Sequence, residues 1–412
     1  MNARKTPAYI PRSTPFSRCK TQHVDLLSGG RLFGLERLSG GVRPSFGLKK
    51  AELLNVPAAA EKMWLSAEGD LYVYSGGALY RSTGARNNFI QFATGFSSCP
   101  RLVRCEGAEG PYAIVSDGVR AVRLEDGSSQ VSSCPPAIPH AFHYSRVFGV
   151  DPQDGCTVRW SQPGDAFGWE EGLNEAGYVR LNAARGKVLA LIPYNNRLVA
   201  VRQYGLSVLR VYGEAEDFRV EVTDTDTSAI YGDTAAVCAG RLLFFTADGL
   251  QSYGSRIESF AAEGLEGFSP SGDAAALGNT YFVCGTLGDE GVIACVGADG
   301  GVGYIAAEAA CLCAAGRAFC ISGGSLYEIV RGYAACSWQS PSDLGSGTVK
   351  FLESIYVDGT AEELTVTCDG LTRTFAGVNG RIYVGMSGKN FAFRAVCPQG
   401  LDGLRAYYAE RR

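Results

Sequence analysis

The sequence predicts an all-β protein: a six- or seven-bladed β-propeller with an extended N-terminal arm and a C-terminal β-sandwich. Three observations lead to this prediction. The chain has 53 glycines among 412 residues, nearly double the usual share of about 7%, and dense glycine without a collagen period indicates many tight turns between short strands. A unit of two apolar runs around a turn recurs over residues 63–332, and the spacing of the apolar runs changes after residue 335.

The composition fixes the broad class. Hydrophobic residues make up 46% of the chain and charged residues 19%, which is typical of a globular protein and excludes a disordered one. The density of turns excludes a helix bundle. No apolar core of a signal peptide follows the N-terminus and no run of 18 apolar residues occurs, so we expect neither secretion by a signal peptide nor a membrane segment.

The first element, residues 1–50, is a basic arm. It holds ten lysines and arginines against two acids, for a charge of +8, whereas the remaining 362 residues carry −12. Three prolines at positions 7, 11 and 15 favour an extended chain. The arm is expected to bind nucleic acid or to dock on an acidic neighbouring subunit, and the alternative is a solvated arm whose charges keep it soluble. The basic residues singled out for contact are Arg4, Lys5, Arg12, Arg18 and Lys20.

The second element, residues 51–335, is the propeller. Seven similar units start at intervals of roughly 30 to 50 residues, close to the length of one four-stranded blade. Hairpin signals punctuate them, since Asn-Asn, Asp-Gly and Gly-Gly pairs favour two-residue turns. A sandwich gives no such period. The turn pairs are Asp117-Gly118, Asp126-Gly127, Asn195-Asn196, Asp248-Gly249 and Gly323-Gly324.

The third element, residues 336–412, begins with a linker rich in Ser, Pro and Gly over 337–347. Six strand candidates follow at a spacing of 7–13 residues, which predicts a small antiparallel sandwich. The candidates are Phe351–Val357, Glu363–Cys368, Leu371–Phe375, Arg381–Val384, Phe391–Val396 and Leu404–Tyr408.

Neither a metal nor a cofactor is expected. The 14 cysteines are scattered without a C-x-x-C motif and are interpreted as small buried hydrophobic residues. Cys311-x-Cys313 has no second pair, and His140-x-x-His143 has no third ligand nearby. Asp224-x-Asp226 lacks the glycine and the distal glutamate of a calcium loop.

The protein is also expected not to be an enzyme. The chain contains no G-x-S-x-G elbow and no phosphate-binding G-x-x-x-x-G-K-[ST] loop. No S-x-D-x-G-x-T-W box of the sialidase propellers occurs. A hydrolase is kept as a third option only, because no nucleophile or pair of acids stands out.

The segment Arg146–Glu171 is the distinctive part of the sequence. It predicts a strand over Val147–Val150, a turn, a second strand over Val158–Ser161, and then the rigid turn Gln162-Pro163-Gly164-Asp165. Two tryptophans, Trp160 and Trp169, are interpreted either as packing anchors or as interaction residues.

This segment resembles a pattern found in propeller-type virion proteins of bacteriophages, including hub and nozzle proteins of short-tailed phages. The run Phe351–Gly359 resembles the terminal sandwich of the same proteins, and Ser39-Gly40-Gly41-Val42 resembles their opening arm. The matching residues of the segment are Arg146, Val147, Phe148, Val158, Trp160, Ser161, Pro163, Gly164, Asp165 and Trp169.

The resemblance implies a structural virion protein that is assembled in the host cytoplasm. It implies a ring of copies, as a hub or nozzle in the tail or at the portal-distal end, that extends or closes the DNA channel. The implied partners are further copies, portal, adaptor or tail proteins, and genomic DNA that passes without specific binding. We expect acidic blade surfaces to line or flank that channel. The acidic stretch Glu214–Asp233 is interpreted as a solvated face or as a seat for the basic arm of another copy.

The alternative is a carbohydrate- or receptor-binding propeller at a tail tip. Sugar-binding sites use exposed aromatic rings with polar neighbours. The candidate rings are Tyr72, Tyr74, Tyr80 and Trp160.

Overall fold

The structure is a computed structural model in which the chain forms two compact units. The first unit comprises residues 1–47, 302–305 and 331–412, and the second comprises residues 48–301 and 306–330. The residues that the structure describes are 21–28, 30–38, 41–52, 55–66, 69–83, 88–107, 110–125, 128–170, 175–221, 225–262, 264–332, 336–340, 344 and 347–410.

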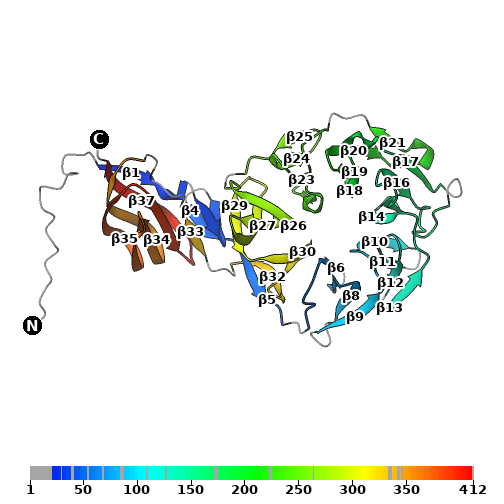
Figure 1. The fold of residues 1–412 in the computed structure, drawn as a ribbon, viewed down its shortest axis with the longest axis horizontal. Helices are drawn as coiled ribbons and strands as arrows, with labels where there is room; N and C mark the ends of the chain where they lie inside the picture. The colour runs from blue at the N-terminus through cyan, green and yellow to red at the C-terminus, as the bar shows by residue number, and fades with distance from the viewer. Residues whose placement is uncertain are drawn as a thin grey trace, which may run out of the picture. The chain divides into compact units, whose positions relative to one another are not determined.

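The second unit is a ring of radial antiparallel sheets (Figure 1). Five four-stranded sheets follow one another along the chain. Their strands are β6 (Lys62–Leu65), β7 (Leu71–Ser75), β8 (Ala78–Thr83) and β9 (Asn88–Thr94); β10 (Arg101–Gly107), β11 (Gly110–Ser116), β12 (Ala121–Glu125) and β13 (Ser128–Ser132); β14 (Ile138–His143), β15 (Arg146–Val150), β16 (Thr157–Trp160) and β17 (Gly177–Arg180); β18 (Val188–Tyr194), β19 (Arg197–Arg202), β20 (Gly205–Arg210) and β21 (Arg219–Glu221); and β22 (Ala236–Cys238), β23 (Arg241–Thr246), β24 (Gly249–Tyr253) and β25 (Ile257–Ser259).

The sixth four-stranded sheet closes the ring. It joins β5, from early in the chain, to β30, β31 and β32, from the end of the repeating region. These strands are β5 (Phe46–Lys50), β30 (Ala309–Ala315), β31 (Arg317–Ser322) and β32 (Ser325–Arg331). Pairing strands from both ends of the ring ties it together without an open seam.

The predicted propeller is confirmed, with six four-stranded blades. Three further antiparallel strands, β26 (Phe268–Leu277), β27 (Thr280–Leu287) and β28 (Glu290–Gly297), occupy the sector between two blades. In that sector β26 packs against β22 on one side and β30 on the other. Short 3-10 helices lie between strands of the propeller: η2 (Ala183–Arg185) before β18, η3 (Ala215–Asp217) between β20 and β21, and η4 (Gly232–Thr234) before β22.

The predicted turn pairs within the described residues connect neighbouring strands. Asn195 and Asn196 have φ values of 46° and 61° between β18 and β19. Gly323 and Gly324, at 53° and 70°, connect β31 to β32. Two positive φ values suit the type I′ turn, whose twist matches that of the flanking strands. The pair Asp126-Gly127 lies outside the described residues.

The core of the propeller lies between neighbouring blades. Phe148 and Trp160 of the third blade, for example, pack in one cluster with Leu191, Leu198 and Leu209 of the fourth. A blade has two apolar faces and cannot cover either one alone, so burial requires that the blades stack around the ring.

The first unit is built on two long strands, β34 (Lys350–Cys368) and β35 (Leu371–Gly388), which form one hairpin. On its other edge β34 pairs with β37 over its first half and with β36 over its second half. Both sets of strands surround one apolar core that includes Leu352, Leu364 and Phe391. The remaining elements are β1 (Thr21–Asp25), η1 (Leu26–Ser28), β2 (Arg31–Phe33), β3 (Leu35–Leu38), β4 (Gly41–Pro44), β29 (Val302–Ala306), β33 (Ser337–Gln339), β36 (Phe391–Val396) and β37 (Leu401–Glu410).

Four of the strands predicted in the C-terminal region were too short. Four of the predicted strands merge in pairs, because β34 and β35 each continue through a bend where the register shifts between Val357 and Ala361. The predicted two-sheet sandwich is not confirmed, since β36, β34 and β37 belong to one continuous hydrogen-bonded order. A bulge lets one strand change direction where the sequence suggests a turn.

The extended N-terminal arm is not confirmed either. Residues 21–50 form β1 to β5 and η1, and five apolar side chains placed between the basic residues are buried in the core. Apolar burial outweighs the extended tendency of a basic, proline-containing segment. These side chains are Leu26, Leu27, Leu32, Leu35 and Val42. The contact residues Arg4, Lys5, Arg12, Arg18 and Lys20 lie outside the described residues.

Candidate functional site

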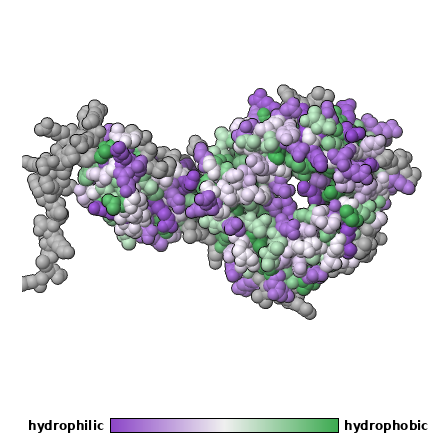
Figure 2. Space-filling view, in the orientation of Figure 1, coloured by the Kyte–Doolittle hydropathy of each residue, from purple (hydrophilic) through white to green (hydrophobic). Residues whose placement is uncertain are grey.

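The first strands of the propeller's sheets surround the centre of the ring. Figure 1 shows β6, β10, β14, β18 and β30 around an open middle. Neighbouring first strands contact each other, as β10 and β14 or β30 and β6 do. The space-filling view shows an opening at the same place (Figure 2). Side chains from distant parts of the sequence therefore meet here.

In the described residues four first strands have bulges, and that of β30 falls between Ala309 and Cys311; the other three mark residues that meet at the centre. The pairing register shifts at His140 in β14, at Leu189 in β18, and across residues 271–273 in β26, just before Ala274. A bulge takes the extra residue out of the ladder and re-aims its side chain, and bulges are common next to functional sites. Asp273 belongs to the third of these bulges.

The groups brought together form what we call the axial cluster. It consists of the side chains of Lys62, Arg101, His140, Asp233 and Asp273, with the backbone oxygen of Leu189 and the backbone nitrogen of Leu312. Each lies on, or just before, a different first strand of the ring. The cluster is therefore a property of the closed ring and not of any single blade.

The charges of the axial cluster are balanced. The Lys62 ammonium pairs with Asp273, whose side chain is 9% exposed, and lies 3.3 Å from the carboxylate of Asp233. The Arg101 guanidinium lies 3.8 Å from the same Asp233 carboxylate. Burial works to lower the pKa of Lys62, but the two carboxylates outweigh it and raise the pKa, so Lys62 stays charged. Burial raises the pKa of Asp273 against the opposing effect of Lys62.

His140 adds a neutral group. Burial, and then the positive charge of Arg101, hold its pKa well below the usual range. Its Nδ1 atom is sealed from solvent and has no hydrogen-bond partner in the described part of the chain. At neutral pH His140 is an uncharged imidazole with one nitrogen unengaged.

The segment that carries Asp233 is held from two sides. Tyr281, which is fully buried, donates from its hydroxyl to the Thr234 oxygen at 2.6 Å. The backbone nitrogen of Phe245 donates to the Thr234 hydroxyl at 2.9 Å. These bonds fix η4, whereas the side chain of Asp233 itself is 55% exposed.

The axial cluster can bind ions and exchange protons. Its two cations suit an oxyanion, and His140 and Asp273 can each accept or donate a proton. Within the described residues, no three His, Cys, Asp or Glu side chains gather closely enough to hold a metal ion. At the centre of the propeller Lys62 and Arg101 stand beside the two carboxylates, and the acidic lining of a DNA channel through a ring of copies stays a prediction.

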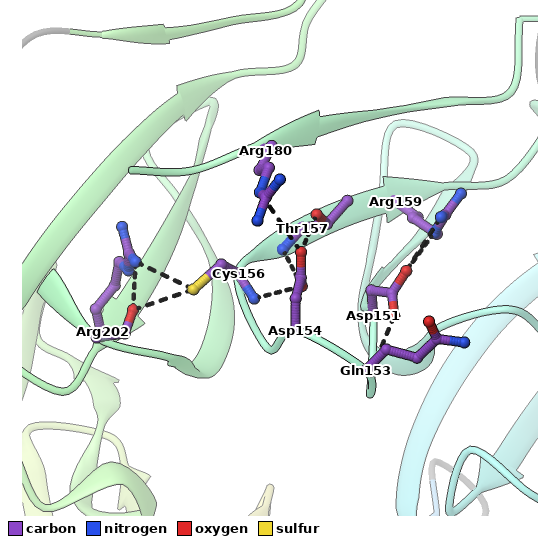
Figure 3. Close-up of polar contacts among 9 residues, drawn as sticks. Asp151, Gln153, Asp154, Cys156, Thr157, Arg159, Arg180 and Arg202 are labelled. Atoms are coloured by element: carbon purple, nitrogen blue, oxygen red, sulfur yellow. Dashed lines mark hydrogen bonds and ion pairs between the residues drawn. The ribbon is translucent and has the colours of Figure 1, made fainter. Parts of the chain in front are cut away.

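The distinctive segment forms the hairpin that was predicted. The carboxylate of Asp154 accepts from the backbone nitrogens of Cys156 and Thr157 at 2.8 and 2.9 Å and from the Thr157 hydroxyl at 2.7 Å (Figure 3). Burial opposes ionisation, but these donors lower the pKa of Asp154. On the same turn Asp151 pairs with Arg159 at 3.0 Å. The turn is thus rigid and pre-organised by its own acids.

Next to this turn lies Arg202, which is 1% exposed. Its guanidinium donates to the Cys156 sulfur at 3.7 Å and to the Gly186 oxygen (Figure 3). Burial lowers the pKa of Arg202. These contacts join Cys156, just before β16, to Arg202 on β19 of the next blade.

The two tryptophans singled out from the sequence both pack inside the propeller. Trp160 is 6% exposed, donates to the Glu175 oxygen at 3.0 Å, and lies 5.1 Å from the ring of Phe218. Trp169 is half-buried and donates to the Ala166 oxygen at 2.8 Å. Both have the geometry of packing anchors, and their role as interaction residues stays a prediction.

The aromatic platform of the carbohydrate alternative is wrong at its main positions. Tyr72 and Tyr74 are 8% and 4% exposed and pack between the first and second blades, and Trp160 is buried as well. Rings closed off in this way offer no surface to a sugar. The remaining candidate, Tyr80, packs against the neighbouring core.

Cysteines in the described residues behave as small apolar groups. None of the thirteen forms a disulfide, and most are buried. Burial raises the pKa of Cys311 to about 12 and that of Cys320 to about 12, so both stay protonated and unreactive at neutral pH. Cys311-x-Cys313 lies within one apolar core cluster.

The first unit exposes a long strand edge. β35 has 18 residues and pairs with β34, and no other described strand pairs with its far edge. Leu371 and Tyr383 on this strand are 73% and 52% exposed. Its two arginines are engaged within the unit, because Arg373 donates to the Val384 oxygen and Arg381 donates to the Ser354 hydroxyl at 2.9 Å. We call this surface the β35 edge.

Sequence reasoning missed most of the axial cluster. Lys62 and Asp273 are 211 residues apart, and no local motif links them. A usable signal is positional: charged residues recur near the beginning of first strands in the repeating units, where blade faces otherwise demand apolar residues. Asp233 was assigned to an acidic stretch, and His140 was considered only as a metal ligand.

Comparisons with known proteins identify the fold. No protein-family model matches the chain, and no curated protein matches it in sequence. The chain is similar to virginiamycin B lyase from Staphylococcus aureus, with a TM-score of 0.52 at 10% identity over 69% of this chain and 99% of that one. It also matches a streptogramin B lyase (TM-score 0.47, 11% identity, 70% and 98% covered) and YCF48 bound to a D1 peptide (0.46, 13%, 69% and 95%).

The likeness to virginiamycin B lyase corrects one prediction. The expectation that the protein is not an enzyme is wrong as it was argued, because it rested on a propeller without familiar nucleophile motifs, and virginiamycin B lyase, an enzyme, has this fold. At about 10% identity the likeness shows the fold and transfers no activity. The chain thus has the all-β propeller fold.

Proposed function

We propose that the protein is a subunit of a self-associating ring in a bacteriophage particle, as a hub or nozzle of the tail or portal-distal assembly. In this role copies of the chain contact one another and adjacent portal, adaptor or tail proteins. Genomic DNA passes through the assembled ring without specific binding. The particle is put together in the host cytoplasm.

The resemblance to phage propeller proteins supports this role. Its residues fall in parts of the structure with defined geometry: the strands β15 and β16, the turn Gln162–Asp165, and the first half of β34. The turn is closed by a bridge between Gln162 and Asp165. These parts build scaffold and surface, which is what an assembly protein needs.

The β35 edge is the observation that carries the proposal. A long strand edge presents unpaired N–H and C=O groups and is a template for pairing with another chain. Natural edges are protected by lysine, proline or shortness. β35 is long, with 18 residues, and contains no lysine and no proline; two register shifts against β34 and two arginines are the protections that it has.

Self-association through this edge can be measured directly. Size-exclusion chromatography with light scattering is expected to show a mass that rises with the concentration of the wild-type chain. The double variant Leu371→Lys, Tyr383→Lys is expected to remain monomeric, because lysine on an edge opposes strand pairing. Both side chains are exposed, so folding is preserved.

The matched control is Tyr178→Lys. Tyr178 is as exposed as Tyr383, at 52%, but lies on the four-residue strand β17 of the propeller. Its variant is expected to associate like the wild type. A monomeric wild type, or equal loss in both variants, would contradict the assembly role.

The phage assignment has its own test. Tailed particles purified from the source culture and analysed by mass spectrometry are expected to contain this chain in fixed ratio to a portal protein. Particles that lack the chain would contradict the virion role even if the chain forms rings.

A further inference from the structure

Asp233 is the loosest member of the axial cluster. Its carboxylate lies 3.3 Å from Lys62 and 3.8 Å from Arg101, whereas charge-assisted hydrogen bonds close to about 2.7–2.9 Å. It is also the most exposed member, at 55%, against 22% for Lys62 and 38% for Arg101. The contact is therefore weak and open to solvent.

The two cations keep their places without Asp233. Lys62 is paired with the buried Asp273, which also accepts from the Leu312 backbone nitrogen at 3.4 Å. Arg101 donates to the Leu189 oxygen at 2.9 Å. Removing Asp233 leaves two positive groups and one carboxylate, for a net charge of +1 at the centre of the ring.

We propose that Lys62 and Arg101 bind a small oxyanion, a carboxylate or a phosphate. The ligand takes the position that the Asp233 carboxylate occupies when no ligand is bound. The oxyanion restores the charge balance that the displaced carboxylate gives up. Its oxygens approach both cations at full hydrogen-bond contact, which Asp233 does not reach because its backbone is fixed on η4. His140, which is neutral beside Arg101, adds no charge to this balance.

This site is independent of the assembly role, because every residue in it belongs to the propeller. It is compatible with a ring that also carries out chemistry, since a bound carboxylate or phosphate lies beside proton-exchanging groups. The class of ligand follows from the two cations, which face one carboxylate.

Another half-buried arginine of the propeller, Arg120, serves as a control. Arg120 lines a surface pocket of about 260 Å³ together with Gln91, Phe92, Thr94 and Ser129. Its guanidinium lies 5.9 Å from the ring of Phe96, and its Nε has no hydrogen-bond partner in the described residues. An oxyanion that binds non-specifically to any half-buried arginine would also bind to Arg120 in this pocket.

The test is isothermal titration calorimetry of the full chain at low ionic strength, with inorganic phosphate and acetate as separate probes. Asp233→Asn removes the competing carboxylate but keeps its shape, and is expected to bind the better probe at least about fivefold more tightly than the wild type does. Arg101→Gln is expected to bind at least about tenfold more weakly. Arg120→Gln is expected to match the wild type.

A neutral or weakening effect of Asp233→Asn would overturn the proposal, as would loss of binding in Arg120→Gln alone. Binding of neither probe to Asp233→Asn would also overturn it. Ligand-induced shifts in melting temperature give a second reading. Asp226→Asn is the control for removing a carboxylate, since Asp226 pairs with Arg185, which is not a member of the axial cluster. The probe that binds more tightly decides between a carboxylate and a phosphate ligand.

Discussion

The two units of the chain treat their sheet edges differently. The outermost strands of the propeller blades are short: β9 has seven residues, β13 five, β17 four, and β21 and β25 three each. The edge strand β35 of the first unit has 18. Short edges are a common protection against unwanted pairing. The propeller is therefore built to be closed, and the first unit is built with an edge left open.

The inner edges of the propeller differ again. There the strands are interrupted by bulges at His140, Leu189 and residues 271–273, and charged groups fill the centre. The difference teaches that one fold can use its outer edges for protection, its inner edges for a polar site and its added unit for association.

The largest expected effect concerns the faces between blades. Phe148 is fully buried beside Trp160 and Phe218, and Phe148→Ala is expected to lower the free energy of unfolding by about 3–5 kcal/mol. Tyr383→Ala on the β35 edge is expected to change it by less than about 0.5 kcal/mol. Urea denaturation measures the free energy of unfolding of both variants. Equal losses in the two variants would contradict the contrast between buried blade faces and an exposed strand edge.

The next largest expected effect comes from replacing an acidic residue in a turn, and each unit offers one such residue. Asp117, which is 5% exposed, accepts from the backbone nitrogens of Val119 and Arg120 and from Ser97. Burial opposes ionisation, but these donors lower its pKa to about 2. Asp117→Asn is expected to cost about 2 kcal/mol at neutral pH.

The pH dependence of Asp117 has a definite sign. Because its folded pKa is lower than the unfolded value of about 3.9, its stabilisation is complete above pH 4 and is lost as the pH falls towards 2. In the first unit the exposed Asp369 accepts from the backbone nitrogens of Lys389 and Asn390, and its pKa is also lowered. Asp369→Asn is expected to cost less than Asp117→Asn in acid and urea titrations, and the reverse order would contradict this account.

A smaller effect tests the support of the axial cluster. Tyr281→Phe removes the hydroxyl that donates to the Thr234 oxygen and leaves that buried oxygen without its donor, at a cost of about 1–2 kcal/mol. Chemical denaturation measures the loss. An unchanged free energy would show that η4 does not depend on this bond.

The local features of the fold could be predicted from the sequence. Turn pairs such as Asn195-Asn196 carry their own geometry, so the hairpins and the repeat followed from a few residues. The length of β35 could not, because Asn379-Gly380 has the composition of a turn while the strand bends there and continues. The strand continues because it pairs with β34 on both sides of the bend, and this pairing cannot be predicted from the neighbouring residues alone.

The candidate site was harder to predict from the sequence, for the same reason. A bulge is defined by the pairing with a partner strand, so the residues next to His140 or Asp273 in the sequence do not predict it. The pairing of Lys62 with Asp273 depends on closure of the whole ring. Basic charges in residues 21–50 also suggested an arm, although the apolar residues between them, such as Leu35 and Val42, are fully buried.

The β35 edge as the place where copies of the chain meet is the central claim, and amide hydrogen exchange tests it most directly. Exchange in the segment Thr372–Gly388 is followed at low and at high protein concentration. Slower exchange at high concentration is predicted for this segment, with no change in the short outer strands β17, β21 and β25, because strand pairing protects only the amides that it engages. Exchange in β35 that is independent of concentration while the protein associates would place the contact elsewhere and contradict the claim.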